Sequence, residues 1–209
     1  MDYYSLPQVS NSDLSWLKDQ TSNKDNLTDK EKVYYMGSLI DAMLTEQDKI
    51  DYIKKTFDGI EVPPEKWELS LNMKRAFIKD KFCAMLLAQS QGQKIIIRDV
   101  ELEYQGIKFT LPMRCKYDLW MEILKYGGDI KSTVCRTQEE FETSIDFFDY
   151  DRQRAVYMTI AQCDYDVLIG ISKINLKIFK KFIKRDDETF KHGMNKFRYL
   201  AYKYYTLFY

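Results

Sequence analysis

Residues 94–134 decide the expected fold, and they read KIIIRDVELEYQGIKFTLPMRCKYDLWMEILKYGGDIKSTV. Apolar and β-branched side chains partly alternate with polar ones along this stretch, and Gly or Pro residues interrupt it, which is typical of paired strands. We expect strands at 94–98, 101–104, 107–111, 114–124 and 129–134. Gly127 and Gly128 are expected to form a turn, and a further strand rich in Val, Leu and Ile is expected at 165–174.

Apolar residues at helical spacing flank this central region on both sides. The expected helices are a short capped one after Ser10, then 29–57, 65–89, 139–147, 151–160 and one from about 186 to the C-terminus. This order predicts an α/β fold with a small central mixed β-sheet flanked by helices. We expect residues 1–30 to be a polar N-terminal segment with a short helix and a linker, and residues 31–209 to form a single domain.

The charge balance excludes a protein that coats nucleic acid indiscriminately, because 32 basic residues are matched by 32 acidic ones. The charges are not evenly distributed along the chain, however: residues 173–209 hold ten Lys or Arg against three acids. The Lys and aromatic side chains of this tail could bind phosphates and stack on bases. The alternative is an amphipathic helix with solvated lysines and with aromatic rings that pack on the sheet or on another subunit.

Membrane insertion and secretion are not expected from this sequence. No apolar run approaches the roughly 20 residues of a membrane helix, and the N-terminus shows no secretory signal. Four cysteines, Cys83, Cys115, Cys135 and Cys163, are widely spaced and form no Cys-x-x-Cys pair, which predicts reduced, buried thiols. We therefore expect a cytoplasmic protein.

Two acidic residues and one lysine stand where two predicted strands meet. Side chains alternate along a strand, so Asp129 and Lys131 share one face while Ile130 faces the core, and a tight connection brings Asp118 close. Two carboxylates suit a hard cation such as Mg²⁺. A neighbouring lysine can orient or deprotonate an attacking water, or neutralise charge on a phosphate. The pattern indicates metal-assisted phosphodiester hydrolysis, and a surface ion pair is the alternative for the Asp-x-Lys triplet alone.

Two helical segments add polar groups to this arrangement. Gln153 and Tyr157 are four residues apart and share one helix face, from which they could hold a phosphate or the lysine. A half-buried amphipathic face is the alternative. Gly37 costs a helix about 1 kcal/mol relative to Ala, which suggests close approach by another group. Asp41, one turn further on, could supply a third oxygen.

Taken together and in order, these residues resemble a known family. The set Gly37…Asp41, Asp118, Asp129-Ile130-Lys131 and Gln153-x-x-x-Tyr157 resembles the PD-(D/E)XK nuclease superfamily. Within that superfamily it is most similar to the phage-type, RecE-like (exonuclease VIII-like) recombination exonucleases. The match extends over residues 36–158, and the DIKST and YDRQRAVY segments at their present separation are its most specific part.

The resemblance implies a restriction-endonuclease-like core and a role for each matched residue. Asp118, Asp129 and Lys131 would be catalytic, with the two carboxylates and the Ile130 carbonyl holding Mg²⁺ (or Mn²⁺) and Lys131 acting on the nucleophilic water. Asp41 stands where the family has a metal-binding histidine and would be a further ligand. The residues implied to face DNA are Gln153, Tyr157, Ser132 and Thr133.

The function implied by the resemblance is a Mg/Mn-dependent deoxyribonuclease. It would be an exonuclease that hydrolyses phosphodiester bonds at linear duplex ends in DNA recombination of a phage or prophage. The implied partners are double-stranded DNA ends, a single-strand annealing or recombinase protein, and further copies of the chain in a homo-oligomer. Because Asp41 replaces the histidine, a catalytically silent DNA- or recombinase-binding protein stays open, as does a related endonuclease. The lone histidine, His192, is expected to be a surface residue.

Overall fold

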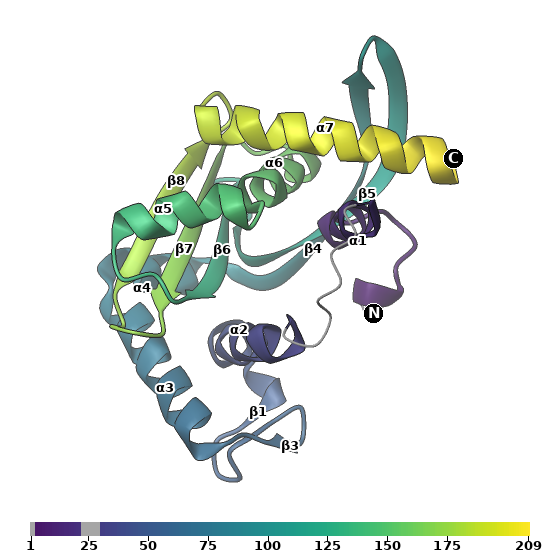
Figure 1. Cartoon of the computed structure of the whole chain (residues 1–209). Helices are drawn as coiled ribbons and strands as arrows, with labels where there is room; N and C mark the ends of the chain where they lie inside the picture. Colours follow the sequence, from purple (N-terminus) through teal and green to yellow (C-terminus); the bar gives the residue numbers. More distant parts are fainter. Residues whose placement is uncertain (1–2, 22–29) are drawn as a thin grey trace.

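The computed structural model describes residues 3–21 and 30–209, in which a five-stranded sheet carries helices on both faces (Figure 1). The strand order is β4-β5-β6-β7-β8. The strands are β4 Gln91–Tyr104, β5 Ile107–Met121, β6 Tyr126–Thr133, β7 Tyr165–Ser172 and β8 Ile178–Lys184. Strands β6 and β7 are parallel, and the other neighbours are antiparallel. The α/β fold class, with a central mixed sheet flanked by helices, is confirmed.

Two helical layers cover the two faces of this sheet. The first layer comprises α1 Asn11–Thr21, α5 Gln138–Phe147, α6 Tyr150–Ala161 and α7 Glu188–Phe208. The second comprises α2 Lys30–Thr45, α3 Pro64–Lys79 and α4 Lys81–Gln89. Alternation along β7 supplies both cores, because Leu168 packs in the first while Val167 and Ile169 pack in the second.

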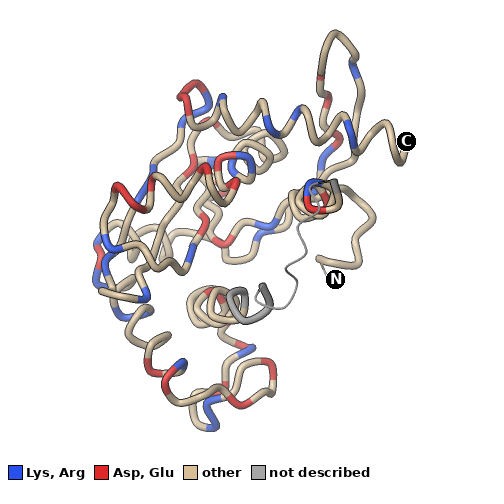
Figure 2. Tube along the Cα trace, in the orientation of Figure 1, with Lys and Arg blue, Asp and Glu red and all other residues tan. Residues whose placement is uncertain are grey.

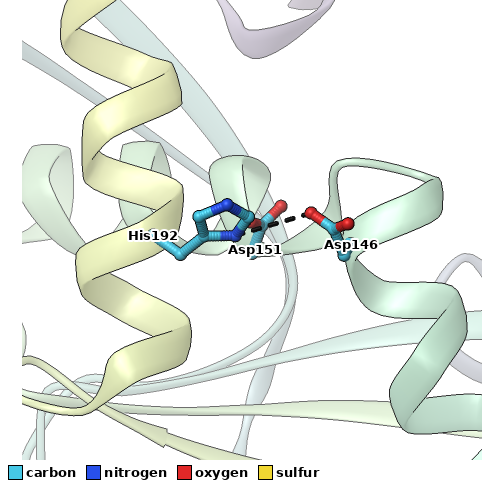
Figure 3. Close-up of side chains that lie close together, drawn as sticks. All are labelled: Asp146, Asp151 and His192. Atoms are coloured by element: carbon cyan, nitrogen blue, oxygen red, sulfur yellow. Dashed lines mark ion pairs between the residues drawn. The ribbon is translucent and has the colours of Figure 1, made fainter.

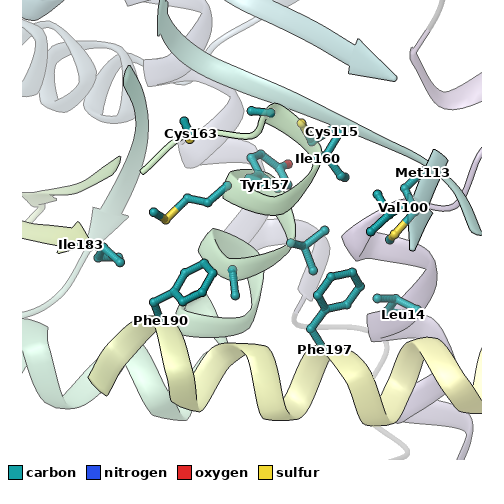
Figure 4. Close-up of a cluster of buried hydrophobic side chains, with 14 of the residues drawn as sticks. Leu14, Val100, Met113, Cys115, Tyr157, Ile160, Cys163, Ile183, Phe190 and Phe197 are labelled. Carbon is teal, nitrogen blue, oxygen red and sulfur yellow. The ribbon is translucent and has the colours of Figure 1, made fainter. Parts of the chain in front are cut away.

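Helix α6 is the central element of the first layer. Nine of its 12 residues are buried, and Figure 4 shows Tyr157 and Ile160 between strand residues such as Met113 and the rings of Phe190 and Phe197 from α7. A fully buried side chain of this size contributes about 1.5–3 kcal/mol through the hydrophobic effect. The packing therefore fixes α6 directly behind the sheet, where Gln153 and Tyr157 were predicted to act.

The expected helix 29–57 is wrong in its second half, since α2 ends at Thr45. The chain then forms the short 3-10 helix η2 Gln47–Lys49 and a small sheet of β1 Ile50–Asp51, β2 Thr56–Phe57 and β3 Ile60–Glu61. The physical reason is the Asp58-Gly59 pair, which has φ of +49° and +78° and closes a two-residue hairpin between Phe57 and Ile60. Such a pair is a strong hairpin signal. The linker predicted at 21–30 falls largely outside the described residues.

The expected helix 65–89 is interrupted at Asp80. This residue is extended, with φ −74° and ψ 119°, and its side chain accepts a hydrogen bond of 3.0 Å from the Cys83 N–H at the start of α4. Asp is a favoured N-cap because its oxygen satisfies an otherwise unpaired N–H group. The second Asp80 oxygen lies 2.6 Å from the Lys180 ammonium of β8, which ties the break to the sheet edge.

The strands also differ from the sequence prediction. The segments expected between 94 and 124 merge into two long strands, β4 and β5, joined at Gln105-Gly106. The predicted turn at Gly127-Gly128 is wrong, because both glycines lie inside β6. A Cβ on Gly127 would come within 2.0 Å of the Tyr117 ring, so this glycine serves close packing. Strand β8 was not predicted, since the adjacent Lys180 and Lys181 interrupt the apolar alternation of its sequence.

The basic tail behaves as the amphipathic interpretation predicts. Figure 2 shows basic residues spaced along β8 and α7. Phe190 and Phe197 are buried in the first core, whereas Lys181 pairs with Glu142 at 3.3 Å. Lys196 likewise contacts several aspartates, so part of the basic charge of this tail is paired within the chain.

Two further expectations concern the cysteines and the membrane. All four cysteines are free and buried, as predicted. Among the described residues, no helix is both long and apolar enough to span a lipid bilayer.

We expect Gly127→Ala to destabilise the protein by about 3 kcal/mol, because the added methyl overlaps the Tyr117 ring in a packed core. Gly37→Ala is the matched control. Its Cβ would lie 3.8 Å from the Ser132 hydroxyl, an ordinary contact, and Ala gains up to about 1 kcal/mol in a helix. Urea unfolding followed by circular dichroism measures both. Equal stability of the two variants would contradict the packing role of Gly127.

Candidate metal centre

The site forms where strands β5 and β6 separate. Their ladder of paired residues ends at Leu119 and Gly128. Asp118 and Asp129 are the next residues of the two strands, beyond the end of the ladder. There the Asp118 carboxylate accepts a hydrogen bond of 2.8 Å from the Ile130 N–H. A side-chain oxygen thus takes the place of a ladder carbonyl, which keeps the buried N–H satisfied while the strands diverge.

Strand β6 presents an acid and a lysine on the face toward α6. The Lys131 ammonium forms an ion pair with Asp129 Oδ2, and Ile130 between them points into the second core. Asp129 is only 2% exposed. The predicted alternation along this strand therefore brings Asp129 and Lys131 together.

Helix α2 contributes Asp41 from the opposite side. The pKa of this carboxyl is raised well above its ordinary value, first by burial and then by the negative charge of Asp118, while the Lys131 ammonium acts in the opposite direction. Asp41 Oδ1 is buried and has no hydrogen-bond partner in the described part of the chain. An oxygen in this state is suited to a cation, because ionisation without one is costly.

The other two charged groups respond to the same crowding. Burial, followed by the charge of Asp129, raises the pKa of Asp118 to about 6. Burial lowers the pKa of Lys131, but the charges of Asp129 and Asp118 more than offset this effect, so the net shift is upward. Lys131 is thereby held as an ammonium ion at neutral pH.

The residues present fit a hard divalent cation. Three carboxylates converge against one lysine, and Asp41 brings a buried oxygen with no partner. Oxygen ligands of this kind suit Mg²⁺ or Mn²⁺. The oxygens of Asp41, Asp118 and Asp129 do not all lie within 4.8 Å of one another, so the side chains would draw together around an ion. The Ile130 N–H is engaged by Asp118, and the role of its carbonyl stays a prediction.

The residues predicted to face DNA lie around this centre at different depths. Gln153 is half-buried, with Oε1 lacking a partner among the described residues. Tyr157 is 8% exposed, and its ring lies 4.3 Å from the Arg154 guanidinium. Ser132 faces α2 near Gly37, and the Thr133 hydroxyl accepts a hydrogen bond from the Cys135 N–H at 3.1 Å. Their roles toward DNA stay predictions.

Sequence reasoning missed two buried charged residues. Arg154 lies 2.7 Å from Asp129 and 3.4 Å from both oxygens of Asp166. Each is at most 1% exposed. The available signal was a charged residue inside an apolar run, as in Arg154-Ala-Val-Tyr-Met of α6 and Tyr-Asp166-Val-Leu-Ile of β7.

A second acidic group lies where α5, α6 and α7 meet, and Figure 3 shows His192 pointing toward Asp146 and Asp151. Ligand atoms of these three residues lie within 4.8 Å of one another, and no other such trio occurs among the side chains that the structure describes, those of residues 3–20 and 35–209. The Lys196 ammonium, however, lies 2.7 Å from Asp146 and 3.0 Å from Asp151. This lysine already pairs with both carboxylates, so the group serves as an ion-pair network. His192 is 56% exposed, consistent with the expected surface position.

The fold and the site together define an α/β protein with a candidate divalent-cation centre at the split between two strands. No protein-family model matches the chain, and neither does any curated protein. Among solved structures, it resembles the phage related exonuclease from Haemophilus somnus 129PT, with 15% identity and a TM-score of 0.44 over 95% of this chain and 93% of that one.

It also resembles the alkaline exonuclease LHK-Exo from Laribacter hongkongensis, with 14% identity and a TM-score of 0.41 over 94% of this chain and 87% of that one. That exonuclease has been solved in complex with dAMP. A third structure, of SSO0001, matches at 13% identity and a TM-score of 0.41 over 70% of this chain, which spans only 62% of that protein.

We expect Asp118→Asn to stabilise the cation-free protein at pH 7. The raised pKa means that the folded state favours the protonated carboxyl, so its contribution to stability is fully present below pH 3.8 and is lost as the pH rises through about 6. Asparagine does not ionise, so it removes this loss of stability, which is worth up to about 3 kcal/mol. Its side-chain oxygen can still accept the hydrogen bond from the Ile130 N–H.

Thermal unfolding of the two proteins between pH 4 and pH 7, in EDTA, measures this difference. The exposed Asp99→Asn on β4 is the control and should show no such trend. Adding Mg²⁺ at pH 7 should stabilise the wild type more than the variant. A stability difference that does not change with pH would contradict the electrostatic account.

Proposed function

We propose that this protein is a metal-dependent DNA exonuclease that hydrolyses phosphodiester bonds at linear duplex ends, in recombination of the phage type. The observation that carries the proposal is the split between β5 and β6, where Asp118 binds the Ile130 N–H beside the Asp129–Lys131 ion pair. Motif order supports it too, since Asp41, Asp118, the Asp129-Ile-Lys131 triplet and Gln153 follow the pattern of the exonucleases that the sequence resembles.

Asp118 and Asp129, with Asp41 and the Ile130 carbonyl, would hold Mg²⁺ or Mn²⁺. A bound ion of this kind supplies Lewis acidity and a water of lowered pKa. The carboxylates fix its place at the split in the sheet. Because two of them have raised pKa values, binding a cation also removes an electrostatic cost of the folded state.

Lys131 acts in its charged form. Since neighbouring carboxylates raise its pKa, the ammonium ion does not serve as a base at neutral pH. It donates hydrogen bonds that orient the attacking water, and it offsets the charge that develops on the phosphate. Gln153, Ser132 and Thr133 would bind the DNA backbone around this centre, and Tyr157 would support them from the core.

The proposed partners include DNA ends, an annealing or recombinase protein and further copies of this chain. An apolar surface at the end of α7 supports subunit contact: Leu207, Phe208 and Tyr209 are each more than half exposed, and Trp16 of α1 lies against Phe208 with ring centroids 6.4 Å apart. Light scattering of the purified protein tests the oligomer directly.

The test is degradation of an end-labelled linear duplex and of a closed circle, with Mg²⁺, with Mn²⁺ and with EDTA. We expect metal-dependent loss of the linear form only, and a fall of at least about a hundredfold for Lys131→Ala, because removing one preorganised donor costs that much. Lys94→Ala is the control, since Lys94 of β4 forms a surface ion pair with Glu122 in the turn after β5.

Other outcomes change the assignment. Cutting of the circle indicates an endonuclease. Absence of cleavage with either metal, while DNA is still bound, indicates a catalytically silent DNA- or recombinase-binding protein. An unaffected Lys131→Ala enzyme removes the proposed site.

Asp41→Asn tests whether the aspartate on α2 replaces the family histidine. Ligand charge tunes cation affinity, so we expect Mn²⁺ to bind roughly tenfold more weakly or worse. Calorimetric titration measures the affinity, and the exposed Asp48→Asn on η2 is the control. Unchanged binding would remove Asp41 from the ligand set.

A further inference from the structure

Arg154 is a fully buried arginine at the centre of the protein. It lies in α6, and its side chain has no exposed surface. A buried guanidinium is expensive unless it is paired and hydrogen-bonded. Its position next to the candidate metal centre therefore requires an explanation.

Arg154 contacts two aspartates, one on each of two strands, and the rings of two tyrosines. Nη2 donates to Asp129 Oδ1 at 2.7 Å, and Nη1 lies 3.4 Å from both oxygens of Asp166. The guanidinium lies 4.3 Å from the Tyr157 ring and 5.5 Å from the Tyr117 ring. The planar group is thus fixed in its orientation as well as in its position.

This arrangement divides the two oxygens of Asp129. Oδ1 is taken by Arg154, whereas Oδ2 is paired with Lys131, the side chain that opens toward solvent. Lys131 is 20% exposed, in contrast to the buried Arg154. Only Oδ2 is therefore presented to the site.

We propose that Arg154 is a positioning residue that holds Asp129 through Oδ1, so that Oδ2 is presented to a divalent cation. The proposal rests on the proposed function, because it assigns an outer partner to one of its metal ligands. Asp166 balances the second half of the guanidinium. Tyr157, whose ring covers the guanidinium, acts on the site through Arg154.

Stability alone does not require an arginine at position 154. Replacing a buried ionic group by apolar side chains of similar volume is often neutral or stabilising. Lysine would supply charge without a fork that reaches Asp129 and Asp166 together. Groups that orient metal ligands typically change metal affinity or activity by 10- to 100-fold when they are removed.

The experiment uses the double variant Arg154→Met/Asp166→Asn in the full chain. Removing both charges together avoids a buried, unpaired carboxylate at position 166, and Asp129 keeps its ion pair with Lys131. The double variant is therefore designed to fold. Mn²⁺ binding is measured by electron paramagnetic resonance, thermal stability by calorimetry, and DNA degradation as above. Arg154→Lys is the second variant; it keeps the charge and loses the fork.

The matched control is Lys180→Met/Asp80→Asn. It removes an ion pair of 2.6 Å between β8 and α4, away from the metal centre, and Asn preserves the helix cap. We expect the control to bind Mn²⁺ as the wild type does. The Arg154 variants should bind it at least about tenfold more weakly while remaining folded.

Each outcome decides between the two proposals. A folded Arg154 variant whose Mn²⁺ affinity stays within about twofold of the wild type overturns the positioning role, whatever its activity. A wild type that binds Mn²⁺ but degrades no DNA overturns the nuclease alone, and Arg154 is then judged on Mn²⁺ binding. A wild type that binds no Mn²⁺ overturns both.

Discussion

The hydrogen bond from the Ile130 N–H to the Asp118 carboxylate is the interaction on which the rest of the site depends. A sheet normally continues its ladder until one strand ends, and an N–H that loses its partner in the interior destabilises the fold. Here a side chain replaces the missing carbonyl, so β5 and β6 part without an unpaired donor. The opening leaves room for Asp129 and Lys131 on one strand and for Asp41 on the helix facing it.

Electrostatic crowding is the consequence of that opening. Three carboxylates near one another in a poorly hydrated region cannot all ionise cheaply, and Asp41 and Asp118 both have raised pKa values. Lys131 and Arg154 compensate part of the charge from opposite sides of Asp129. The cation-free protein is therefore strained electrostatically at neutral pH, and binding of the proposed divalent ion would relieve that strain.

The sequence predicted elements well where a local pattern had only one structural solution, and less well where packing decided. Helices α5 and α6 and the strand around Asp129 follow from periodicity and turn residues. The pair Gly127-Gly128 reads as a turn by composition, yet the Tyr117 ring requires the space of the absent side chain inside a strand. Asp80 interrupts a helix that hydrophobic spacing alone would have continued, and the Asp58-Gly59 pair closes a hairpin where a helix was expected.

By itself, the sequence determined that Asp129 and Lys131 share one face of a strand, because side chains alternate with a period of two whatever the surroundings. It also determined that Gln153 and Tyr157 share a helix face, through the 3.6-residue turn. Only the tertiary structure decided which oxygen of Asp129 is available, since Arg154 reaches it from α6 across 25 residues of chain. The distance of Asp41 from the other carboxylates was likewise decided by how α2 packs on the sheet, and no local pattern contains that information.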